Sequence, residues 1–236
     1  MAFPTVAART ESALTTAGTT WTPTFTQATG NLVIIMFSLN AAAAQALSSV
    51  GDSFVNLTNR TGNAHVVYKV LDGSEGGNVA ITVASNAKFC GAIWQIAAGT
   101  FDPAQAPEIA AVATQGEGAG GNAPNSGTIT APWGSDDNLF ISFFHQNGEE
   151  LDDDTWCTSA PTNYGNLTQS TTGTAGGSTT NSQLAAADRF LAAATDDPGA
   201  FATAQDRATQ CFTLVIKPVS AGGGGNRRRR FFMAAG

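Results

Sequence analysis

The chain has 236 residues and a formal net charge of −7, and only 12% of its residues are charged. A chain of this length can bury a large core within one domain, and its charged fraction is far below the quarter that is usual for globular proteins. The sequence opens with no basic segment followed by an apolar run, and no stretch approaches the roughly 18 apolar residues of a membrane span, so we expect neither a signal peptide nor a membrane anchor.

The predicted elements are short strands, rich in β-branched and aromatic residues and bounded by Gly, Asn, Pro or Asp. In chain order they cover residues 5–9, 22–26, 31–40, 53–58, 64–71, 79–84 and 88–98, and then 128–131, 138–146, 155–159, 183–193, 200–204 and 209–219. Alanine-rich residues 41–47 are expected to form a helical turn or loop. Alanine-rich residues 184–194 are expected to form a strand, because they occupy the place of residues 64–71 in the first half.

Two apolar runs show that the chain repeats one pattern. Residues 31–40 (NLVIIMFSLN) and 138–147 (NLFISFFHQN) both begin with Asn-Leu and end with Asn. The offset of about 105–120 residues is too long for a solenoid repeat. The pattern predicts a single all-β domain over residues 1–221, an antiparallel jelly-roll-like β-sandwich built from halves 5–100 and 125–219. Both runs hold more apolar residues than one face requires, so we expect them to be buried on both sides.

The three cysteines do not form a pattern typical of disulfide frameworks or zinc sites. Cys90 and Cys211 occupy matching places in the two halves. We expect buried thiols that pack as small apolar groups, with a Cys90–Cys211 bridge as the alternative.

No motif predicts catalysis or cofactor binding. Residues 116–121 satisfy G-x-G-x-x-G, but the sequence that follows cannot start the helix that a dinucleotide site needs. The acidic run 149–154 lacks EF-hand spacing and is expected to be a solvated loop. His65 and His145 lie in predicted strands without a nucleophile motif, and His145 aligns with Ser38 of the first half, which suggests an outward or interfacial position. We therefore expect no enzyme activity, no cofactor and no metal.

The C-terminal segment differs from the rest of the chain. Residues 222–226 are glycine-rich and are expected to act as a flexible hinge before an arm that contains Arg227, Arg228, Arg229, Arg230, Phe231 and Phe232. Subtracting the four arginines from the net charge of −7 leaves −11 for the rest of the chain. We interpret residues 222–236 as an assembly arm that binds an acidic neighbouring subunit, with a solvated tail and a nonspecific nucleic-acid contact as alternatives. A dedicated nucleic-acid binder would be expected to carry a basic face.

Several motifs of the chain resemble those of a known protein family. They are Pro161-Thr-Asn-Tyr164, Leu184-Ala-Ala-Ala-Asp-Arg189, Asp197-Pro-Gly-Ala-Phe201, Ile216-Lys-Pro218 and, in the first half, Tyr68-Lys-Val70 before a glycine-rich turn. Over about residues 5–219 the chain resembles a family of β-sandwich proteins encoded by tailed bacteriophages and prophages. The arginine-rich segment lies outside this resemblance.

The resemblance implies a virion structural protein, made in the host cytoplasm and located in the virion. We expect a capsid decoration (cement) protein or a comparable surface protein of head or tail. Its partners would be other virion proteins and further copies of itself, bound through edge strands and terminal arms, with no membrane partner. The alternative function is a carbohydrate-binding or adhesin module, with Trp133, Trp156 and Tyr164 as its glycan platform.

Overall fold

The computed structural model describes residues 2–40, 44–58, 62–111, 113–115, 123–148, 156–173, 181–204 and 207–220. Its regular structure within these ranges consists of strands and no helix, and all strand pairs are antiparallel. The predicted all-β antiparallel sandwich is confirmed.

The first half of the chain forms one six-stranded sheet. Its strands follow the order β1-β6-β2-β5-β4, and β3 also pairs with β6. The strands are β1 (Val6–Trp21), β2 (Leu32–Asn40), β3 (Leu47–Val50), β4 (Val55–Asn56), β5 (Ala64–Val70) and β6 (Ile81–Ile96).

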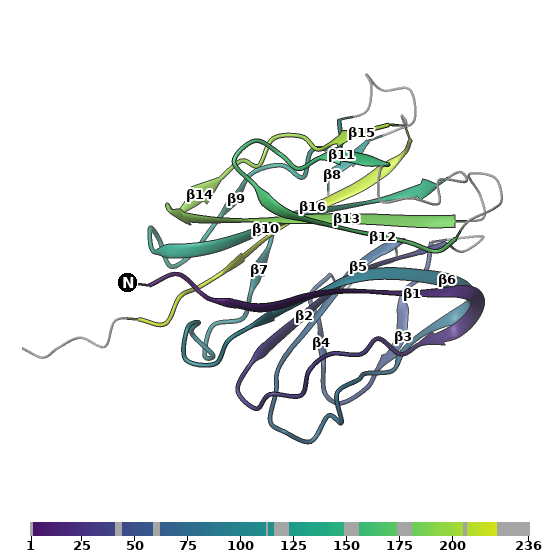
Figure 1. The fold of residues 1–236 in the computed structure, drawn as a ribbon, viewed down its shortest axis with the longest axis horizontal. Helices are drawn as coiled ribbons and strands as arrows, with labels where there is room; N and C mark the ends of the chain where they lie inside the picture. Colours follow the sequence, from purple (N-terminus) through teal and green to yellow (C-terminus); the bar gives the residue numbers. More distant parts are fainter. Residues whose placement is uncertain are drawn as a thin grey trace, which may run out of the picture.

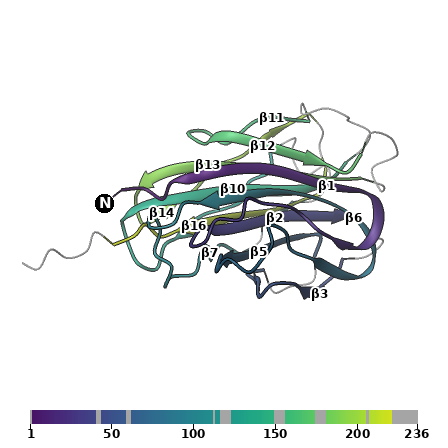
Figure 2. The same ribbon diagram turned by 60° about the horizontal axis from the view of Figure 1, so that its bottom comes forward.

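The second half forms the other six-stranded sheet, which lies over the first (Figures 1 and 2). Its order is β12-β13-β10-β16-β7, and β8 also pairs with β16. The strands are β7 (Glu108–Ile109), β8 (Ala113–Gln115), β10 (Asp137–Gly148), β12 (Gly165–Thr171), β13 (Asn181–Ala192) and β16 (Thr209–Ile216). Two short pairs accompany it, β9 (Ile129–Thr130) with β14 (Thr195–Asp196) and β11 (Cys157–Ser159) with β15 (Ala202–Thr203).

The two apolar runs occupy equivalent central positions. β2 lies between β5 and β6, and β10 lies between β13 and β16. Each sheet takes its strands from one half of the chain, so this strand order does not establish a jelly roll, in which two Greek keys span both sheets.

The core has three layers. The inner layer lies between the sheets and draws on both halves, for example Ile34 of β2 and Ile141 of β10. Alternate residues point the other way, so that Ile35 lies in an outer layer on the first sheet and Phe140 in an outer layer on the second. The apolar side chains of both central strands are therefore buried on both faces, as predicted. Because the inner layer is shared, the two halves are held together by one core.

Several local predictions require correction. β1 runs to Trp21, whereas the segment expected as a strand at residues 22–26 holds only an isolated bridge at Thr24. The alanine-rich strand is confirmed as β13, and the described part of residues 41–47 ends in the start of β3. Residues 41–43 lie outside the described part of the chain.

The three cysteines are free and buried, as expected. Cys90 faces the inner layer, whereas Cys211 faces the outer layer of the second sheet. The alternative of a Cys90–Cys211 bridge is therefore wrong, because the two thiols lie on opposite faces of the second sheet.

Candidate functional site

A polar network lies between the two sheets. It links Ser38 of β2, Cys90 of β6, Ser182 of β13 and His145 of β10, and all four side chains are buried. The hydroxyl oxygens of Ser38 and Ser182 are 2.6 Å apart, the Cys90 sulfur lies 3.1 Å from Ser38 Oγ, and His145 Nδ1 lies 3.3 Å from Ser182 Oγ. His145 thus faces the interface between the sheets, which was one of the positions expected for it.

This network contains a histidine beside a serine, which sequence inspection did not foresee. Burial lowers the pKa of His145 to about 3, and the backbone of Gln183, rather than a carboxylate, is its other hydrogen-bond partner. Burial also raises the pKa of the Cys90 thiol to about 12. A general base needs access to substrate and a pKa near the working pH, and a cysteine nucleophile needs a thiolate. The network therefore suits packing rather than catalysis, and the absence of enzyme activity stays a prediction.

The described residues include no group of three or more His, Cys, Asp and Glu side chains that could hold a metal ion. In the same part of the chain, no helix is long and apolar enough to cross a membrane.

A charged cluster joins the two sheets near their edges. Asp188 of β13 has a side chain that is 1% exposed, and its Oδ2 accepts hydrogen bonds from Arg9 Nε at 2.6 Å and Trp94 Nε1 at 2.8 Å. Its Oδ1 accepts from Asn166 Nδ2 at 2.8 Å. The Arg9 guanidinium also lies 5.9 Å from the centroid of the Trp94 ring. Arg9 of the first sheet thus supplies the countercharge for a carboxylate buried in the second sheet, and Trp94 of the first sheet supplies a further hydrogen bond.

Two motifs of the second half, residues 161–164 and 184–189, contact the same carboxylate, that of Asp196. Residues 161–164 form a β-turn in which Tyr164 N donates to Pro161 O at 3.0 Å. The third residue of this turn, Asn163, takes a φ of 67°. The turn requires a positive φ at this position, and Asn tolerates it. The turn places the Tyr164 hydroxyl on Asp196, which also accepts from Arg189 Nη1 at 2.8 Å. Burial, together with the Asp196 carboxylate, raises the pKa of Tyr164. These motif residues therefore have a structural role.

The first-half motif also has a structural role. Lys69 Nζ lies 2.7 Å from Glu75 Oε1, and the Glu75 carboxylate accepts from the backbone amides of Asp72 and Gly73 and from Gln27 Nε2. Burial opposes ionisation of Glu75, but the hydrogen bonds from Gln27 and Lys69 outweigh it and hold its pKa far below the usual range. Lys69 of the Tyr68-Lys-Val70 motif thus fixes the glycine-rich turn that follows it.

The three aromatic residues expected to form a glycan platform do not form one. Trp156 and Tyr164 are buried in the outer layer of the second sheet. Trp133 is half-buried, and its Nε1 donates to Asn138 Oδ1 at 2.8 Å. A stacking platform needs exposed ring faces, so this alternative site is wrong.

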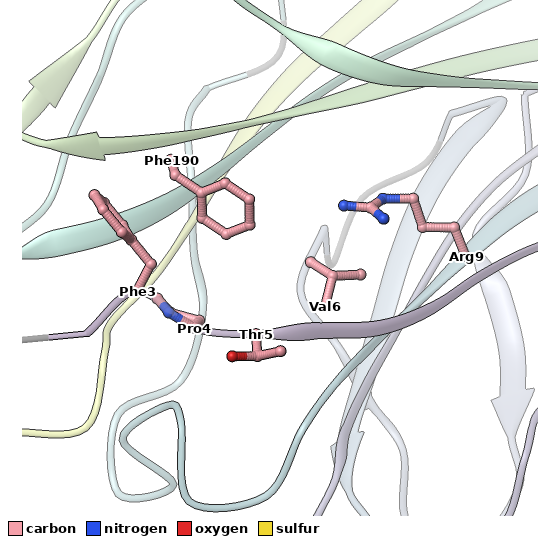
Figure 3. Close-up of a pocket in the computed structure, with 6 residues that line it drawn as sticks. All are labelled: Phe3, Pro4, Thr5, Val6, Arg9 and Phe190. Atoms are coloured by element: carbon pink, nitrogen blue, oxygen red, sulfur yellow. The ribbon is translucent and has the colours of Figure 1, made fainter.

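An apolar depression lies where the start of the chain passes the end of β13 (Figure 3). It has a volume of about 540 Å³ and is lined by Phe3, Pro4, Thr5, Val6, Arg9 and Phe190. The rings of Phe3 and Phe190 meet edge to face with centroids 5.5 Å apart, yet Phe3 is 36% exposed and Phe190 is 42% exposed. Figure 3 shows the Arg9 side chain reaching toward this depression from β1.

The described chain ends beside the same depression. Thr5 N donates to Thr100 Oγ1 at 2.9 Å, and Val219 N donates to Thr100 O at 3.2 Å. Val219 is itself 38% exposed. Of the four large apolar side chains that are exposed in the described residues, Phe3, Phe190 and Val219 therefore gather at one end of the molecule, while Val55 belongs to β4.

The depression was not predicted, because its walls come from opposite ends of the sequence. The one available signal was Phe190, a large apolar residue that follows the Asp-Arg pair in an otherwise alanine-rich strand. The expected assembly arm, with Arg227, Arg228, Arg229, Arg230, Phe231 and Phe232, lies outside the described residues, as do residues 116–121 and 149–154.

Comparisons with protein-family models, with curated proteins and with solved structures found no match for this chain.

Proposed function

We propose that the protein is a non-catalytic structural subunit of a tailed-bacteriophage particle, a capsid decoration protein or a comparable surface protein of head or tail. Its partners in this proposal are neighbouring virion proteins and further copies of itself. The phage assignment rests on the motifs quoted above, and the binding role rests on the structure.

The observation that carries the binding role is the apolar depression. In the described residues, the histidines, the cysteines and the carboxylates of Asp188 and Asp196 are buried, and the partners found for them are intramolecular. The exposed aromatic surface instead gathers around Phe3 and Phe190. Exposed apolar patches rimmed by polar residues can mark surfaces that bind other proteins, and we infer that this depression is part of such a surface.

The free edges of the sheets are less suited than the depression to binding another chain. β4, β7 and β8 are short, and β1 has register irregularities between Leu14 and Thr20. Short edge strands and bulges both discourage pairing with another chain. The edge of β12 is approached by β1, since Ser170 Oγ donates to Ser12 O at 3.3 Å. We therefore propose that the depression, rather than a sheet edge, makes the principal contact.

The test uses particles of the phage that encodes the chain, prepared without it. Purified protein is added back, and its copy number per particle is measured after sedimentation. We expect saturable binding that is strongly reduced by Phe190→Ser. The matched control is Val55→Ser, which removes an exposed apolar side chain from another part of the surface and should bind like wild type. Absence of binding by the wild-type chain would overturn the phage assignment, and equal binding by the Phe190→Ser variant would overturn the role of the depression.

A further inference from the structure

We propose that the apolar depression at Phe3 and Phe190 receives the Phe231–Phe232 pair from the arm of a second copy of this chain. This inference rests on the proposed structural function only in requiring that copies meet, and it names the partner and the contact.

The depression has the chemistry to hold aromatic side chains. Its lining is apolar except for Thr5 and Arg9, and Arg9 is already neutralised by Asp188 at 2.5 Å. Two aromatic rings, Phe3 and Phe190, remain partly exposed and meet edge to face. Further aromatic rings could add offset or edge contacts of the same kind.

Carboxylates lie beside the depression in a position that suits the arginines. The register of β10 and β13 pairs Leu139 with Phe190 and Asp137 with Ala192. Residues that are opposite each other, and residues two apart along a strand, share a face of the sheet, so Asp137 lies on the same face as Phe190, one step further along. Asp136 precedes it and is partly exposed. In the sequence of the arm, Arg229 and Arg230 directly precede the phenylalanines, so an aromatic pair held in the depression would bring basic groups close to these carboxylates.

The length of the arm favours a second copy over the same chain. The described chain ends at Ser220, beside the depression, and ten residues separate Ser220 from Phe231. Ten residues span up to about 33–36 Å when fully extended. This length exceeds what is needed to reach the adjacent depression of the same chain, but it suits a neighbouring subunit. Such a contact is heterologous, and repeated copies would form a ring or a chain of subunits.

Two full-length variants separate donor from acceptor. Phe231→Ser/Phe232→Ser removes the aromatic pair of the arm and keeps the depression, and Phe190→Ser damages the depression and keeps the arm. Sedimentation velocity should show concentration-dependent association of the wild-type chain, and monomers for each variant alone. A mixture of the two variants should form a one-to-one heterodimer, because one supplies the arm and the other supplies the depression. Val55→Ser is the matched control and should associate like wild type.

A labelled peptide of residues 222–236 tests the chemistry of the contact. It should bind the Phe231→Ser/Phe232→Ser chain saturably, and replacing both phenylalanines of the peptide by serine should weaken binding at least about tenfold, since the burial of two aromatic side chains is lost. Asp136→Asn/Asp137→Asn should weaken binding and reduce its salt dependence.

The outcomes are distinct. If the wild-type chain stays monomeric while the peptide binds the Phe231→Ser/Phe232→Ser chain, the arm occupies its own depression and the second-copy proposal is wrong. If the serine-substituted peptide binds as tightly as the original, charge alone holds it and the depression is not its site. Neither result bears on whether the chain binds particles, which the add-back experiment decides separately.

Discussion

Replacing Arg9 by methionine tests the charged cluster that joins the two sheets. The substitution keeps an unbranched side chain over Trp94 but leaves the Asp188 carboxylate, whose side chain is 1% exposed, without a countercharge. Removing one member of a buried pair typically costs about 3–5 kcal/mol. Trp94 and Asn166 still donate to Asp188, and the Arg9 side chain is 24% exposed. We therefore expect a loss near the lower limit, about 3 kcal/mol in the free energy of unfolding.

The assay is urea unfolding followed by tryptophan fluorescence, with the free energy taken from the midpoint and slope. The double variant Arg9→Met/Asp188→Asn removes both charges and should recover much of the loss, because the buried charge is then absent. The control is Lys217→Met, which breaks the partly exposed pair with Asp102 at 2.9 Å and should cost about 0–1 kcal/mol. A loss for Arg9→Met no larger than that of the control, or a double variant no more stable than the single one, would show that Arg9 does not stabilise the buried Asp188 carboxylate.

Three further predictions concern buried polar groups. Tyr164→Phe removes the hydrogen bond to the buried Asp196 and should lower the free energy of unfolding by about 1–3 kcal/mol in the same urea assay, and an unchanged midpoint would contradict this. Because the pKa of His145 is about 3 in the folded chain and 6.5 ordinarily, only the unfolded chain takes up this proton between those values. Stability should therefore fall with decreasing pH through this window by up to about 1.4 kcal/mol per pH unit, and His145→Gln should remove that part of the slope when unfolding is measured from about pH 7 to about pH 4. Since burial raises the pKa of Cys90 to about 12 and the thiols of Cys157 and Cys211 are also buried, a thiol-specific reagent should label the native protein far more slowly than the urea-unfolded chain, and equal rates would place these thiols at the surface.

Strands with strong apolar patterns could be predicted from the sequence. Residues 31–40 and 138–146 have more apolar side chains than one face of a sheet can use, and burial on two faces follows directly from that excess. The alanine-rich β13 was recognised through its place in the repeat, although its composition favours a helix.

Strands without such a pattern were missed. β12 has the sequence Gly-Asn-Leu-Thr-Gln-Ser-Thr, and it is a strand because it pairs with β13, not because of its own propensity. β7 and β8 have two and three residues and likewise depend on their pairing with β16.

The positions of individual side chains relative to the surface depended on tertiary structure. Trp156 and Tyr164 were candidates for an exposed glycan platform, but the outer layer of the second sheet buries them. Cys90 and Cys211 matched in sequence yet face different layers, because a difference of one residue in strand register reverses the side of the sheet. The depression joins Phe3 to Phe190, and no local pattern could bring these two together.

The proposed role of this chain is that of a structural subunit that binds its neighbours through the depression at Phe3 and Phe190. The most direct measurement is a cryo-electron microscopy map of the phage particle that encodes it, with the sandwich fitted into the density. We expect an ordered copy at every equivalent position, with a neighbouring chain covering Phe3 and Phe190. A particle without this chain, or a map in which both phenylalanines face solvent, would contradict it.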